Sequence, residues 1–155
     1  MYKIFVVLIA FFAILPSCKQ LDTSVQAFNI PNAQWYSNAK PTFTFVITNE
    51  TAKYEMAFLI RHTNNYKYNN LFVNVAYNAA GIVGTAQHIE IPLTNNNTSW
   101  SGKLFNNIVE TYVTAKILPD SILIKKGTYT FTIENIMRED PLPEILQIGL
   151  MVKKH

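Results

Sequence analysis

Apolar and polar residues alternate with a period of two along much of this chain. In residues 42–48, Phe43, Phe45 and Ile47 alternate with threonines at positions 42, 44 and 48, and residues 128–133 repeat the pattern. Strict alternation of this kind is typical of a β-strand with one buried and one solvated face. Both segments are therefore predicted to be half-buried strands.

Other apolar patterns predict further strands. Residues 56–62 form a short apolar run, which indicates a strand buried on both faces. Residues 71–77 place four apolar side chains on one side, and residues 145–152 predict a closing strand. Residues 87–91 and 112–118 give weaker strand patterns.

Asparagine- and glycine-containing turn signals separate these segments, for example Ala80-Gly81 and Asn106-Asn107. Seven or more short strands with turns between them predict an all-β fold, a single antiparallel β-sandwich of Ig-like or jelly-roll-like type over residues 28–155. Only residues 105–112 and 136–140 could form a short helical turn, and Pro141 ends the second one.

The N-terminus has a different character. Lys3 is followed by an almost unbroken apolar run over residues 4–15, which is too short to span a bilayer. Leu15-Pro16-Ser17-Cys18 then resembles the lipobox of a bacterial lipoprotein signal peptide. We interpret residues 1–17 as that signal peptide, Cys18 as the lipid-attachment residue, and residues 18–27 as a flexible tether. The alternative is an ordinary secretory peptide that contains a cysteine.

Composition narrows the function classes. Cys18 is the sole cysteine, so its lipidation would exclude structural disulfides. The chain carries 13 Lys and Arg against 10 Asp and Glu, a balance without the basic clusters that nucleic-acid binding needs. A lipid on Cys18 would anchor the protein to a membrane without spanning it.

No catalytic or metal-binding constellation is visible. His62 ends an apolar run, which favours a packed histidine, and His88 is expected to be exposed; neither has ligands at metal spacing. Glu139, Asp140 and Glu144 are interpreted as a solvated turn, with a calcium loop as the alternative. No serine has the context of a nucleophile. We therefore expect no enzyme activity, no metal and no cofactor, and we do not expect a small-molecule ligand.

Four aromatic residues flank loops: Trp35, Tyr66, Tyr68 and Trp100. Exposed rings can anchor a protein partner or stack on a sugar. The alternative is that these rings cover the ends of the sandwich core. Tyr66 and Tyr68, which lie among polar residues, are the preferred candidates for a contact surface.

Several stretches, in order along the chain, resemble the gliding-motility lipoprotein family GldH of the Bacteroidetes. They are the lipobox cysteine and the segments 31–35, 43–47, 60–71, 100–102, 127–131, 137–138 and 148–149. The resemblance implies a non-enzymatic lipoprotein of the cell envelope that acts in gliding and in the associated type IX secretion machinery. The resemblance implies no catalytic residues. The one residue role that it implies for this chain is lipid attachment at Cys18.

The leading hypothesis is a structural or interaction lipoprotein that contacts envelope proteins of the motility and secretion machinery. The alternative is a carbohydrate-binding surface lipoprotein that uses its aromatic rings. Lys19-Gln20-Leu21-Asp22 is poorer in acids than typical surface-export signals, which favours the outer membrane facing the periplasm, with surface exposure left open. Asp120-Ser121-Ile122 fits a short O-glycosylation pattern of these bacteria, so Ser121 is a candidate modification site.

Overall fold

The computed structural model describes residues 22–96, 98–118 and 124–155. The predicted signal peptide, Cys18 and Ser121 lie outside these residues. The described part consists of strands, turns and one 3-10 turn, η1 (Pro31–Ala33), and it contains no α-helix. No helix in this part is long and apolar enough to cross a membrane.

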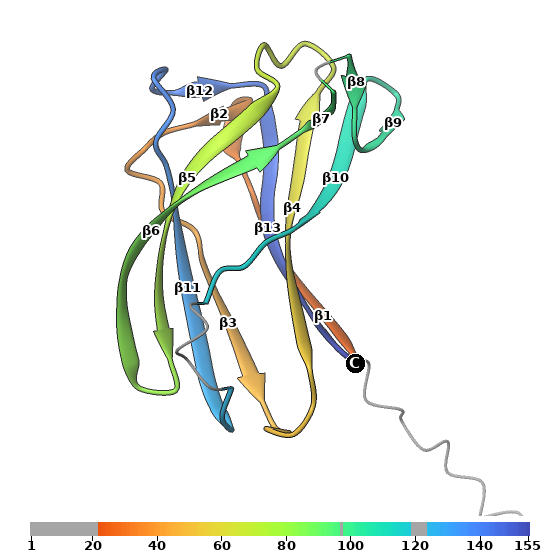
Figure 1. Ribbon diagram of the computed structural model, residues 1–155. Helices are drawn as coiled ribbons and strands as arrows, with labels where there is room; N and C mark the ends of the chain where they lie inside the picture. Colours follow the sequence, from red (N-terminus) through yellow and green to blue (C-terminus); the bar gives the residue numbers. More distant parts are fainter. Residues whose placement is uncertain (1–21, 97, 119–123) are drawn as a thin grey trace, which may run out of the picture.

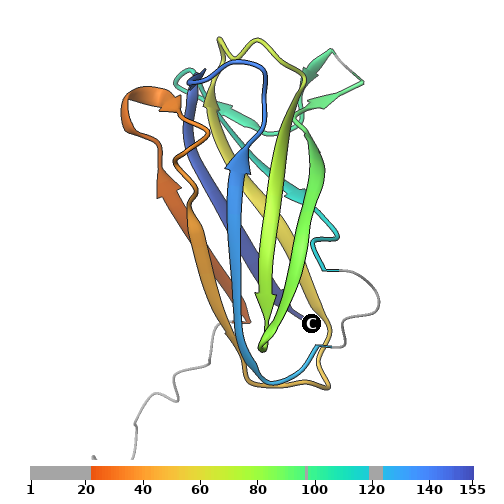
Figure 2. The ribbon, with the colours of Figure 1, turned by 90° about the vertical axis from the view of Figure 1, so that its left-hand side faces the viewer.

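The strands form two facing antiparallel sheets and two short ribbons (Figure 1). The five-stranded sheet has the order β1 (Thr23–Asn29), β13 (Ile145–Lys154), β4 (Tyr54–Thr63), β10 (Ile108–Thr114) and β9 (Lys103–Phe105). The four-stranded sheet, which faces the viewer in Figure 2, has the order β3 (Thr42–Ile47), β11 (Gly127–Asn135), β5 (Asn70–Ala79) and β6 (Ile82–Pro92). The ribbons pair β12 (Leu142–Pro143) with β2 (Gln34–Trp35), and β7 (Thr94–Asn95) with β8 (Ser99–Trp100).

The hydrophobic core lies between the two sheets, and the period-two pattern explains why. Phe43, Phe45 and Ile47 of β3 are buried, while Thr42, Thr44 and Val46, which alternate with them, are exposed. The outward threonines Thr42 and Thr44 face Thr132 and Thr130 of β11, with hydroxyl oxygens 3.0 and 3.3 Å apart. The predicted sandwich is therefore confirmed.

Most strand predictions are confirmed. Strands β5, β11 and β13 cover the predicted segments, and β3 covers its segment except for Thr48. Strand β4 is buried on both faces from Met56 to Ile60. The weak signal at residues 87–91 belongs to β6, which starts earlier, at Ile82.

The predicted tether is too long. Residues 23–27 belong to β1, whose whole length pairs with β13 from Thr23–Lys153 to Asn29–Gln147. The Gln26 side chain also bonds the backbone of Thr44 on β3, donating to its carbonyl and accepting from its N–H, and so joins the two sheets along this side. An edge strand with polar residues on both faces has no clear alternation, so the long-range pairing decides its structure.

The helical turn predicted at residues 105–112 is wrong. This segment contains the end of β9, the turn Asn106-Asn107 and most of β10. Strand β10 ends at Thr114, so the weak strand prediction at residues 112–118 overlaps only its last residues. Residues 136–140 form bends and no helical turn.

The sandwich has two ends with different surroundings. Asp22 and Lys154 lie together at one end, where the Lys154 N–H donates to the Asp22 carbonyl at 2.6 Å (Figure 1). We call this the terminal end. The β4–β5 connection, β8 and the turn between β9 and β10 lie at the opposite end, which we call the distal end. A ten-residue strand such as β4 spans roughly 30 Å between them.

Candidate functional site

Three of the four predicted aromatic residues meet at the distal end, together with His62. We call His62, Tyr66, Tyr68 and Trp100 the distal aromatic cluster. The ring centroids of His62 and Trp100 are 4.5 Å apart, those of His62 and Tyr66 5.2 Å, and those of Tyr66 and Tyr68 5.6 Å. The cluster forms because the end of β4, the β4–β5 connection and β8 converge at this end of the sandwich.

Hydrogen bonds fix the orientation of these rings. The Tyr66 hydroxyl donates to the backbone carbonyl of Asn70 at 3.0 Å, and the Trp100 indole N–H donates to Asn64 Oδ1 at 2.7 Å. Tyr66 is buried, whereas Tyr68 and Trp100 are half-buried. Burial raises the pKa of the Tyr66 phenol, so this group stays protonated at physiological pH.

His62 lies fully buried beneath the rings of Tyr66 and Trp100. Its Nδ1 lies 2.8 Å from the carbonyl of Thr63, a contact in which Nδ1–H acts as donor. Its Nε2 has no hydrogen-bond partner among the described residues. Burial lowers the pKa of His62, and the bond to Thr63 opposes this only in part. His62 is therefore a packed residue, as the sequence predicted, and its burial favours the neutral form.

The cluster borders an open cleft of about 560 Å³. Its lining includes Asn64, Tyr66, Lys67, Thr98, Trp100 and Leu104. Lys67 forms an ion pair of 3.1 Å with Glu139, which lowers the pKa of that carboxyl through the hydrogen bond. The cleft thus combines amides, hydroxyls and partly exposed rings, groups suited to non-covalent contact.

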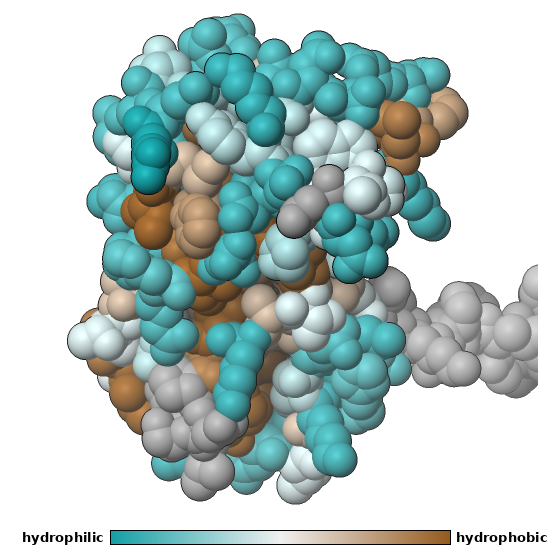
Figure 3. Space-filling view, turned by 45° about the horizontal axis from the view of Figure 1, so that its top comes forward, coloured by the Kyte–Doolittle hydropathy of each residue, from teal (hydrophilic) through white to brown (hydrophobic). Residues whose placement is uncertain are grey.

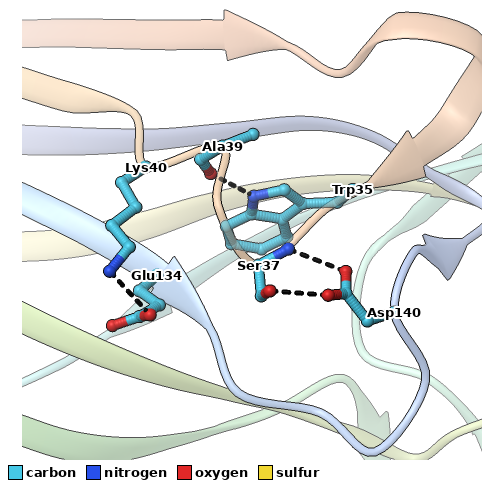
Figure 4. Close-up of polar contacts among 6 residues, drawn as sticks. All are labelled: Trp35, Ser37, Ala39, Lys40, Glu134 and Asp140. Atoms are coloured by element: carbon cyan, nitrogen blue, oxygen red, sulfur yellow. Dashed lines mark hydrogen bonds and ion pairs between the residues drawn. The ribbon is translucent and has the colours of Figure 1, made fainter.

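Trp35 does not contribute a contact surface. It is fully buried, and its indole N–H donates to the Ala39 carbonyl at 2.8 Å (Figure 4). Next to it, the backbone N–H of Ser37 donates to Asp140 Oδ1 at 2.8 Å and its hydroxyl donates to Oδ2 at 2.6 Å. Trp35 therefore covers the end of the core, which is the structural alternative considered from the sequence.

Burial also limits the role predicted for Tyr66. With its ring packed between neighbours and its hydroxyl bonded to the backbone, Tyr66 cannot offer a free face for stacking. Of the four predicted aromatic residues, Tyr68 and Trp100 alone keep partly exposed side chains. The carbohydrate alternative is accordingly weakened, because two of its four proposed platforms are inside the core.

The acidic residues of the 139–144 loop have separate structural contacts. Glu139 pairs with Lys67, Asp140 accepts from Ser37, and Glu144 accepts a hydrogen bond from the Thr63 hydroxyl. In residues 22–96, 98–118 and 124–155, no group of three or more His, Cys, Asp or Glu side chains is placed to hold a metal ion.

Sequence reasoning missed the hairpin formed by β9 and β10, which stands beside the cleft. Leu104 lines the cleft, while Phe105 and Ile108 lie on the outer face of the five-stranded sheet. The paired asparagines at its turn are a hairpin signal that the sequence did contain.

The fold and this geometry define an all-β sandwich domain with an aromatic cluster and cleft at one end. Residues 24–152 match the family model of the GldH lipoprotein, and the chain belongs to this family. A relative is the gliding motility lipoprotein GldH of Flavobacterium johnsoniae, 26% identical over 127 residues, which cover 77% of each chain. The predicted family membership is therefore confirmed.

Solved structures give weaker likenesses. A family 35 carbohydrate-binding module from Clostridium thermocellum is 11% identical, with a TM-score of 0.34 over 83% of this chain and 91% of that chain. An exo-β-1,3-galactanase from Phanerochaete chrysosporium is 12% identical, with a TM-score of 0.36 over 82% of this chain. The match covers only 29% of the galactanase. We infer neither fold nor function from them.

Proposed function

We propose that this family member is a non-enzymatic interaction lipoprotein, anchored through Cys18, that acts in gliding motility and the associated type IX secretion machinery. The family match over residues 24–152 carries the proposal, because it covers almost all of the folded domain. In the proposal the lipid on Cys18 attaches the protein to the periplasmic face of the outer membrane. The partners are envelope proteins of the machinery.

The arrangement of the domain supports this role. The chain enters β1 at Thr23, at the terminal end, so a lipid on Cys18 would hold that end near the membrane. The cleft and the distal aromatic cluster lie at the opposite end. A domain held in this way would direct its distal end away from the lipid and towards other envelope components.

The side chains of the cleft support a role in binding rather than in catalysis. Lys67 is paired with Glu139, and the phenol of Tyr66 is buried and bonded to the backbone. The imidazole of His62 is covered by the neighbouring rings. General acid–base work needs a titratable group within reach of a substrate, which these contacts oppose.

Deletion of the gene in the source bacterium, with complementation by wild-type and C18S forms, tests the proposal. We expect deletion to abolish surface spreading in a gliding host and to leave type IX cargo inside the cells. The wild-type form should restore both, and mass spectrometry should find acyl chains on Cys18. The C18S form should be released from the membrane fraction and fail to complement. Normal spreading and secretion in the deletion strain would contradict the proposal.

A further inference from the structure

We propose that the β9–β10 hairpin is a docking surface for an envelope protein that presents an apolar side chain bordered by a carboxylate. We call Leu104, Phe105 and Ile108 the hairpin ridge. The inference deepens the proposed function and rests on it, because it names the surface by which the lipoprotein would engage its machinery.

The ridge exposes a large apolar area. The exposed fractions of Leu104, Phe105 and Ile108 are 56%, 76% and 40%. In Figure 3, a small group of brown and tan atoms lies at the upper right, over the region of β9, apart from the larger brown area in the centre of this view. Burial of apolar surface is worth about 25 cal/mol per Å², so such a group favours association with an apolar partner.

The backbone of the ridge is paired as a tight hairpin. Phe105 and Ile108 are directly paired across the turn, and the turn residues Asn106 and Asn107 have φ values of 45° and 66°. Asparagine tolerates this left-handed backbone better than most residues. At the base of β9, Gly102 lies so close to Thr111 that an added Cβ would be 2.1 Å from its Oγ1. A backbone that is already paired loses less conformational entropy on binding than an open loop would.

The ridge stands between two hollows. On one side Leu104 borders the 560 Å³ cleft of the distal aromatic cluster. On the other side Phe105, Ile108, Lys103, Arg61 and Glu110 border a hollow of about 440 Å³. A partner side chain could therefore be seated beside Phe105 instead of resting on a flat sheet.

The charged residues around this hollow indicate which group flanks the apolar side chain of the partner. Arg61 and Glu110, which both line the hollow, form an ion pair with each other. Lys103, exposed at its rim, forms no ion pair within the described parts of the chain. A carboxylate on the partner would complement this cation and fix the orientation of the complex.

The position favours a protein over the anchoring membrane as the occupant. The tether between Cys18 and β1 consists of residues 18–22, which extend to at most about 18 Å. The ridge lies at the distal end, roughly 30 Å along the strands from the point where this tether enters. The lipid would thus hold the end of the domain opposite to the ridge.

The test places a photo-crosslinking amino acid at position 105 of the full-length lipoprotein in living cells of the source bacterium. The matched control position is Val83 at the terminal end, which is 77% exposed against 76% for Phe105. We expect position 105 to give one defined protein adduct, identified by mass spectrometry, and position 83 not to give it. Binding of the purified partner to the purified full-length lipoprotein should weaken about tenfold or more with F105S and with K103E, and not with V83S.

Specific outcomes overturn the inference. Adducts to lipid alone at position 105 would assign the ridge to a membrane surface, and adducts to a second copy of the chain would assign it to self-association. Equal affinity of the F105S and wild-type proteins, with the same urea midpoint, would also overturn it. If deletion stops gliding and secretion but position 105 gives no partner, the proposed function stands and the ridge proposal fails.

Discussion

The two ends of the sandwich each carry a hairpin with a two-residue turn and exposed apolar side chains, yet the hairpins differ in construction. The terminal hairpin joins β5 to β6 through Ala80-Gly81, with φ values of 49° and 90°. The distal hairpin joins β9 to β10 through Asn106-Asn107, with φ values of 45° and 66°. Both turns need left-handed backbone at both positions, but Ala80 is poorly suited to it.

Their surroundings differ as well. Ile82 and Val83 start an edge strand of the four-stranded sheet, at the same end as the entry of the chain into β1. Phe105 and Ile108 border a hollow with charged neighbours at the far end. Exposure alone is nearly equal for Val83 and Phe105. The comparison teaches that turn chemistry, flanking hollows and distance from the entry point distinguish a candidate contact surface from an exposed apolar residue.

The largest expected effect on the free energy of unfolding comes from removing the buried ring of Tyr66 at the distal end. Y66A removes a buried ring and its bond to Asn70, so we expect a loss of about 3–5 kcal/mol in the free energy of unfolding. Urea denaturation measures it, and Y66F, which keeps the ring, should lose only about 1 kcal/mol. Equal stability of Y66A and wild type would show that the distal end does not depend on this ring.

A paired glycine substitution compares the two hairpins directly. In G102A the new Cβ would lie 2.3 Å from the Glu110 carbonyl oxygen and 2.1 Å from Thr111 Oγ1, so β9 must shift, at a cost of about 1–3 kcal/mol. In G81A the Cβ meets open space, and only the positive φ costs about 1 kcal/mol. Only G102A should also weaken partner binding at the ridge. Identical partner binding by G102A and G81A would contradict the expected difference between the two hairpins.

Acidification should act through His62. Its pKa is lowered in the folded state, so the unfolded state binds more protons once the pH falls below the ordinary value of 6.5. The free energy of unfolding should therefore fall as the pH drops from 6.5 towards the lowered folded pKa. Urea titrations at several pH values should show this slope in wild type and in the control H88Q, and a smaller slope in H62Q. An unchanged slope in H62Q would contradict the assignment.

The smallest expected effect concerns the terminal turn. A80N places a residue that tolerates positive φ at position 80, which should raise the free energy of unfolding by about 0.5–1 kcal/mol. Thermal or urea unfolding measures the gain, and N106A at the distal turn is the matched change in the opposite direction. A loss of stability in A80N would show that this turn is not strained by its alanine.

A strand of this fold could be predicted from the sequence when one of its faces is buried and the other is solvated. Strands β3 and β11 were predicted because each has one buried apolar face and one outward face rich in threonine, which leaves a clear alternation. Strand β1 was missed because its polar residues are distributed on both faces and only pairing with the distant β13 defines it. The false helical turn arose because Phe105, Ile108 and Tyr112 recur at helical spacing, although Asn106-Asn107 forms a hairpin turn.

The site was predictable only in part, for a related reason. The sequence identified the aromatic residues that gather at the distal end, but not which of them would be covered. Whether Trp35 and Tyr66 face solvent depends on how the ribbons and loops close the sandwich, a packing outcome that local sequence does not encode. The ridge was missed because its residues were assigned to the wrong element.

The pairing of β1 with β13 has a mechanical consequence. Seven residues of β1 run alongside β13, with their hydrogen bonds perpendicular to the strands. A pull between a lipid at the terminal end and a partner at the distal end would run parallel to the strands. All of the β1–β13 hydrogen bonds would then be loaded in shear at the same time, instead of breaking one after another from one end. Tension on the short segment before β1 would thus be transmitted to the whole domain without separating β1 from β13.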